Sequence, residues 1–203
     1  MNKATIVAVL GLLTAGVSQA GNILATNFDE VSSAQRPFST NAGVPIGLTA
    51  QGVVQLGSFT SADPGALIAG LGTPAGLAAL LADFIVFGSS SQIGADFAGL
   101  YASDKSTPIA SDSTLVGKSI YTLVGNNATL AGSSELAIIR DDQSFAFDNP
   151  VFEALADISA GSSVILFGSP TGPGFTTLLG PAPSSLSLGV AVPEPMSAAL
   201  LLS

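Results

Sequence analysis

The chain has 203 residues, which leaves room for one domain, or for two small ones, once targeting segments are set aside. Hydrophobic residues make up 47% of it and charged residues only 9%, which excludes a globally disordered chain. The net charge of −9 and the scatter of the few Lys and Arg residues exclude nucleic acid as a partner, because a nucleic-acid site needs clustered positive charge.

Residues 1–20 have the three parts of a secretory signal peptide in their usual order. Lys3 supplies the positive start, and residues 4–13 form an apolar run too short to span a bilayer. Ser18 and Ala20 place small residues at the positions that signal peptidase reads. The pattern therefore predicts cleavage between Ala20 and Gly21, with signal peptidase as a partner.

The first half of the mature chain reads as strands interrupted by one helix. Residues 22–28 and 52–59 have strand patterns. Two start signals follow, Asp63-Pro64 before a helical turn at 66–71 and Thr73-Pro74 before a helix at 75–84. A short strand at 85–87 is expected to end at Gly88 and the serines after it.

The second half reads as further short strands. We expect strands at 119–124 and 136–139 in a hairpin or meander, and an alternating strand pattern around Phe145 and Phe147. A helical turn is expected at 152–158, a strand at 163–167 and a last strand at 175–179. Together these elements predict a mainly β fold with one helix, β-sandwich-like or α+β, as a single domain over residues 21–180.

The C-terminal end combines a linker with a short motif. Residues 181–191 are rich in Pro and Ser and read as a linker. Pro193, Glu194 and Pro195 follow, and then an uncharged apolar run. The prolines hold this segment extended and keep an upstream helix from running through it.

This end resembles the PEP-CTERM sorting tail of exported proteins from exopolysaccharide-producing Gram-negative bacteria. In that family a Pro-Glu-Pro motif precedes one transmembrane helix and an Arg-rich cluster, and a membrane exosortase cuts the tail near the motif. The resemblance implies that Pro193, Glu194 and Pro195 are the sorting motif and that residues 192–203 hold the motif and the start of the helix. Residues 117–140, and the run LLADFIVFGSS from Leu80, are also similar to stretches of small, uncharacterised exported proteins with such tails.

The tail departs from the family pattern in length and charge. Only eight residues follow Pro195, whereas a bilayer span needs about 20, and the Arg cluster is missing. We therefore expect the tail as printed to be either truncated or degenerate.

The composition restricts the chemistry that the chain can perform. It has no His and no Cys, which removes triads built on His and the common zinc, haem and iron–sulfur sites. Carboxylate chemistry stays open, with Glu135 and Glu153 as candidates for a glycosidase pair. The densest set of calcium-type oxygen ligands is Asp141, Asp142, Asp148 and Asn149, but it lacks the spacing of an EF-hand.

We therefore expect an exported, non-enzymatic protein of the cell surface or extracellular matrix, without cofactor, metal or catalytic residues. It would pass the inner membrane, be anchored there transiently, be sorted by an exosortase-type enzyme, and associate with exopolysaccharide or biofilm. The alternative is a secreted carbohydrate-active enzyme or carbohydrate-binding module that uses a carboxylate pair.

Overall fold

The computed structural model describes residues 20–27, 35–94, 98–108, 113–145, 154–157, 163–172, 174–177 and 180–192. Strands predominate, and the mainly β fold class predicted from the sequence is confirmed. The elements in chain order are β1 (Ala20–Thr26), β2 (Phe38–Ser39), β3 (Gly52–Phe59), α1 (Gly65–Ala69), α2 (Pro74–Asp83), β4 (Phe84–Ile93), β5 (Ala102–Pro108), β6 (Ser119–Gly125), β7 (Glu135–Ser144), β8 (Ala154–Asp157), β9 (Val164–Phe167), β10 (Ser169–Thr171), β11 (Thr176–Thr177), β12 (Gly180–Pro181), β13 (Ser185–Ser187) and β14 (Gly189–Val190).

The largest sheet has six strands and forms the centre of the molecule. Its order is β14-β7-β6-β3-β4, and β9 also pairs with β7, all in antiparallel register. Every residue of β3 is buried. A strand that is buried on both faces requires a covering layer on each side of the sheet.

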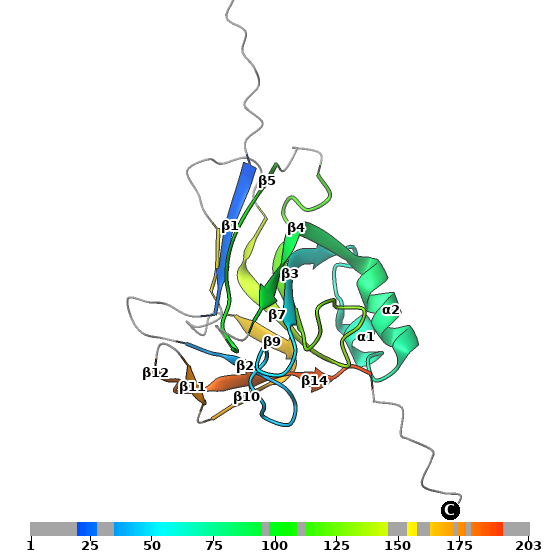
Figure 1. Cartoon of the computed structure of the whole chain (residues 1–203). Helices are drawn as coiled ribbons and strands as arrows, with labels where there is room; N and C mark the ends of the chain where they lie inside the picture. The colour runs from blue at the N-terminus through cyan, green and yellow to red at the C-terminus, as the bar shows by residue number, and fades with distance from the viewer. Residues whose placement is uncertain are drawn as a thin grey trace, which may run out of the picture.

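The two covering layers differ in kind. On one face, Leu123 and Ile138 belong to the same apolar cluster as Leu80 of α2. On the other face, Leu56 and Ile139 cluster with buried side chains of β1, β2 and β13. In Figure 1, α1 and α2 accordingly lie on one side of β3, β4 and β7, with β1 and β5 on the other.

Helix α2 confirms the predicted helix and its start signal. The Thr73 side chain accepts a hydrogen bond from the amide of Gly76 at 3.0 Å, and Pro74 occupies the first helical position. Leu77 and Leu80 are its buried residues. The turn expected at 66–71 is a second short helix, α1, which buries none of its residues.

Two expected elements near the middle and end of the chain were wrong. The segment expected as a helical turn at 152–158 contains strand β8, which pairs in parallel with β1 from Ile23↔Ala154 onward. The strand expected to end at Gly88 continues as β4 to Ile93, because pairing with β3 resumes beyond an irregularity at residues 88–90, as in the pair Val53↔Gln92. In both places long-range pairing outweighs local preference.

The linker expected at 181–191 is part of the fold. It contains β13 and β14, and Leu186 and Ala191 are fully buried. The domain boundary at Gly180 was therefore placed too early, because packed chain continues to Val192. For the same reason residues 175–179 do not hold the last strand, since three strands follow β11.

Asn27, at the end of β1, joins the segments that lead into the smaller sheets. Its side chain donates to the carbonyls of Gly99 at 2.7 Å and Arg36 at 3.1 Å, and accepts from the amide of Tyr101 at 2.9 Å. The residue is completely buried, so these bonds satisfy a polar group that has no access to water.

Candidate functional site

A small three-stranded sheet, β10-β13-β2, has one apolar and one hydroxyl face. β13 runs antiparallel to β10 and parallel to β2, with the pairs Thr171↔Ser185 and Ser187↔Ser39. Because side chains alternate along a strand, Leu186 points to the core while its neighbours Ser185 and Ser187 share the opposite face. The register therefore places hydroxyl groups from three strands on one face.

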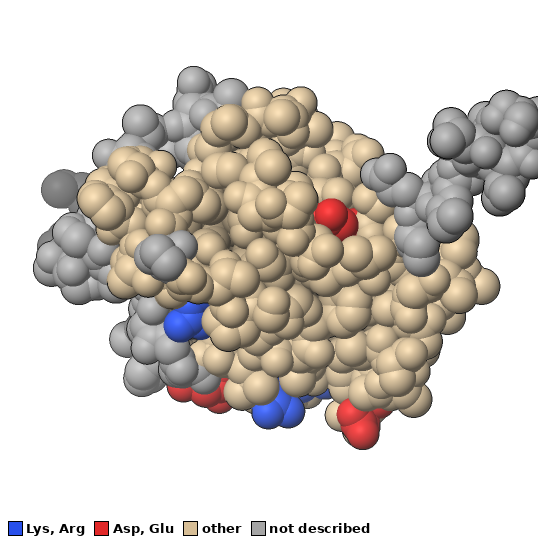
Figure 2. Space-filling view, turned by 90° about the horizontal axis from the view of Figure 1, so that it is seen from below, with Lys and Arg blue, Asp and Glu red and all other residues tan. Residues whose placement is uncertain are grey.

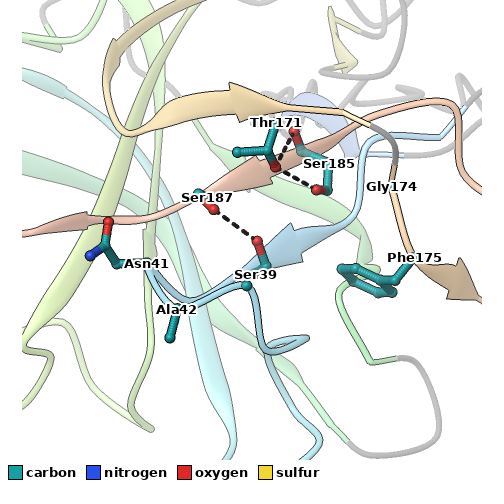
Figure 3. A pocket seen from close by; sticks show the side chains of 9 residues that line it. Ser39, Asn41, Ala42, Thr171, Gly174, Phe175, Ser185 and Ser187 are labelled. Atoms are coloured by element: carbon teal, nitrogen blue, oxygen red, sulfur yellow. Dashed lines mark hydrogen bonds between the residues drawn. The ribbon is translucent and has the colours of Figure 1, made fainter.

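This hydroxyl face borders an open pocket of about 410 Å³. Figure 3 shows the hydroxyls of Thr171, Ser185, Ser187 and Ser39 between Asn41 at one end and Phe175 at the other. The backbone of the neighbouring loops completes the lining, and none of the described lining residues carries a charge.

The hydroxyl groups of the pocket bond to one another in two pairs. The Oγ atoms of Ser39 and Ser187 lie 3.1 Å apart, and Ser187 donates to the carbonyl of Thr40 at 3.2 Å. Because a serine has one hydroxyl proton, Ser39 is the donor within that pair. The second pair joins Thr171 Oγ1 and Ser185 Oγ at 2.7 Å.

The ring of Phe175 packs close to the backbone of Gly99. Gly99 adopts a φ of +77°, and a Cβ atom there would lie 2.5 Å from Phe175 Cζ and 2.9 Å from Pro37 Cβ. Only glycine combines that backbone conformation with such close approach. Glycine at position 99 therefore leaves room for the ring of Phe175, which is the one aromatic ring among the described residues that line the pocket.

Glu135 lies beside the loop at the other end. Its Oε2 accepts a hydrogen bond of 2.7 Å from the amide of Asn41, which ties the loop to the first residue of β7. The candidate acid Glu135 thus contacts Asn41, which lines the pocket. Its expected partner, Glu153, lies outside the described residues, so the pair is not tested.

Only two of the four calcium candidates, Asp141 and Asp142, lie among the described residues. Asp141 is buried and its Oδ1 accepts from the amide of Gln143 at 2.9 Å, whereas Asp142 is exposed. Asp148 and Asn149 lie outside the described residues. Within the described ranges, no group of three or more acidic, His or Cys residues is placed to hold a metal ion.

The predicted processing sites lie at the two ends of the described fold. Ala20 and Gly21 are the first residues of β1 and pair with Pro108 and Thr107. The motif Pro193-Glu194-Pro195 lies outside the described residues, immediately after Val192. Of the helices that the structure describes, neither is long and apolar enough to cross a membrane.

A local signal for the hydroxyl face was present in the sequence but was assigned to a linker. Residues 185–188 read Ser-Leu-Ser-Leu, an alternation typical of a half-buried strand. The pairing of β13 with β2 has no local signal, because the two strands lie far apart in the sequence.

The chain matches no family model, no curated protein and no solved structure.

Proposed function

We propose that this chain is an exported, non-enzymatic protein of the cell surface or extracellular matrix, sorted through its C-terminal tail and associated with exopolysaccharide. The observation that carries the proposal is the position of the two predicted processing sites relative to the fold. Cleavage before Gly21 would remove one residue from β1, and cleavage after Val192 would leave β14 intact.

The packing at both ends of the domain supports the proposal that it stays folded after both cleavages. Ile23 is buried in the main apolar cluster, three residues after the predicted signal peptide cleavage site. Ala191 is also buried, and its amide and that of Val192 donate to the carbonyl of Ser134 at 2.8 and 2.9 Å. An enzyme acting at either site would therefore release a domain that keeps its core.

The chemistry of the pocket supports a binding role over a catalytic one. Hydrolysis by a serine or threonine requires a neighbouring base to activate the hydroxyl. The hydroxyls here are paired with other hydroxyls and with backbone carbonyls, and the chain has no His. Such groups hold a ligand by hydrogen bonds without activating it.

The sorting part of the proposal is tested by expression from the full gene in a host with and without its exosortase. We expect export in both, an N-terminus at Gly21, and a lower mass only where the enzyme is present. A Glu194→Gln variant should lose that mass change, whereas Asp142→Asn, an equal loss of charge at an exposed site, should keep it. Identical mass and location in both hosts, or retention of Met1, would reject the proposal.

A further inference from the structure

We infer that the pocket between Asn41 and Phe175 binds a neutral saccharide, an inference that rests on the proposed association with exopolysaccharide and names the chemistry of the contact. The pocket volume of about 410 Å³ lies within the range of about 300–1,000 Å³ typical of small-molecule sites. The hydroxyl face, the loop at Asn41 and the ring of Phe175 each contribute one part of the recognition.

Charge selects a neutral ligand. No described residue lining the pocket is charged, and the chain carries a net charge of −9. Figure 2 looks onto the end of the molecule where β2, β10 and β14 lie, and it shows a mostly uncharged surface, with most of its few charged side chains near the lower edge of the view. A phosphate or carboxylate would find no Lys or Arg to pair with among the described lining residues and would be repelled by the net negative charge of the protein.

The direction of the hydrogen bonds selects a ligand with several O–H groups. Ser187 uses its proton on the Thr40 carbonyl and Thr171 uses its proton on the Ser185 carbonyl at 3.4 Å, so the remaining capacity of both oxygens is to accept. Asn41 adds an exposed amide that both donates and accepts. A carboxylate has no proton to give to these acceptors, whereas a sugar has several.

The depth of the lining residues defines a fixed floor and an accessible rim. Ser39, Ser185 and Ser187 are at most 6% exposed, whereas Asn41 and Thr171 are exposed. The buried hydroxyls hold the short strands in register, while Asn41 and Thr171 lie at the rim. The Thr171 hydroxyl is paired with that of Ser185 at 2.7 Å and keeps further capacity to accept a hydrogen bond from a ligand. Because the floor is already bonded, ligand binding needs little rearrangement.

Phe175 supplies the apolar part of the site. A sugar ring has an apolar C–H face as well as its hydroxyls, and aromatic side chains offer a flat apolar surface for such a face. The ring packs close to the backbone of Gly99, and Figure 3 shows Phe175 at the end of the hydroxyl row opposite Asn41. A pocket with a polar floor and one fixed ring matches both faces of a saccharide.

The test titrates the purified full chain with maltotriose, cellotriose, mannotriose and tri-N-acetylchitotriose, with trigalacturonic acid as the charged comparison. Calorimetry gives the affinity, and backbone amide shifts give the location. We expect saturable binding of at least one neutral probe, with shifts at Asn41, Thr171 and Phe175, and at least tenfold weaker binding of the acid. Absence of saturable binding for every neutral probe, or equal binding of the acid, would overturn the inference.

Matched variants locate the contact. Thr171→Val keeps the shape and removes the exposed hydroxyl, so affinity should fall about fivefold; Phe175→Leu should reduce it about tenfold. Ser90→Ala removes an exposed serine hydroxyl of β4, away from the pocket, and should leave affinity unchanged. Unchanged affinity in both pocket variants would contradict the assignment. Binding does not depend on export, so failed sorting with intact binding would reject the proposed function alone.

Discussion

Side chains alternate between two faces in both the six-stranded sheet and the three-stranded sheet β10-β13-β2, but the two sheets differ in the kind of side chain that occupies each face. Strands β3, β6 and β7 have 8, 7 and 10 residues, and apolar side chains occupy both of their faces. Strands β2, β10 and β13 have 2, 3 and 3 residues, with apolar side chains on one face and hydroxyls on the other. The long sheet contributes apolar burial, and the short sheet turns a face of hydroxyl groups toward the pocket; among the described hydroxyls that line it, only that of Thr171 belongs to an exposed residue.

This difference indicates that the apolar faces of the sheets provide stability, whereas the hydroxyl face of the short sheet serves the proposed binding. The apolar face of the short sheet joins the core through Phe38 and Leu186, both completely buried. Substitutions on its hydroxyl face should therefore leave the apolar contacts of the core in place. The three predictions below test how far that separation holds.

The largest expected effect comes from truncating a buried leucine in each sheet. Leu123 of β6 and Leu186 of β13 are both completely buried. We expect Leu123→Ala to lower the free energy of unfolding by about 3–5 kcal/mol, and Leu186→Ala by about 2–3 kcal/mol, because shorter strands relax more readily around a cavity. Urea unfolding of the two variants measures the difference. Equal costs would show that the short sheet is as rigidly packed as the long one.

An intermediate effect is expected at Asn27, which anchors the segments leading to the short sheet. Asn27→Ala removes three side-chain hydrogen bonds and leaves the buried amide of Tyr101 without its 2.9 Å bond to Oδ1, so we expect a loss of about 2–3 kcal/mol. Hydrogen exchange should accelerate at Tyr101.

The matched control is Asn126, whose Oδ1 accepts from Ser134 and Glu135 in the half-buried turn between β6 and β7. Asn126→Ala should cost about 1 kcal/mol, because water reaches the groups that it leaves unpaired. A larger cost at Asn126 than at Asn27 would place the more important polar anchor in the long sheet.

The smallest expected effect is a pH dependence confined to the long sheet. Burial raises the pKa of Tyr121 from its usual value of 10.0, opposed by the charge and hydrogen bond of Arg140, its cross-strand partner. The folded state therefore holds the phenol proton more tightly than the unfolded chain does. Its contribution to stability is complete below pH 10 and is lost as the pH rises through the folded pKa.

Stability should then fall above pH 10 by at most about 1.4 kcal/mol per pH unit from this group. Tyr121→Phe should flatten that decline without changing the slope below pH 9, as measured by urea unfolding at a series of pH values. The same alkaline slope in Tyr121→Phe and wild type would assign the decline to other groups.

The sequence was most informative where the signal is local. The Thr73-Pro74 cap predicted α2, the partial alternation in residues 52–59 predicted β3, and the apolar run at 119–124 predicted β6, each to within a residue or two. It was least informative where the partner is distant. β8 owes its extended form to pairing with β1, although the chain between them exceeds 100 residues.

What the sequence by itself determined is the mainly β class, the helix and the absence of His and Cys chemistry, because composition, caps and alternation act within a few residues. Only the tertiary structure decided that a Pro- and Ser-rich stretch belongs to the core and that a hydroxyl pocket exists. The Oγ atoms of Ser39 and Ser187 bond to each other across 148 positions of sequence. No local pattern specifies such a pair, because it forms only when the apolar faces of β2 and β13 pack together on the long sheet and bring their hydroxyl faces into register.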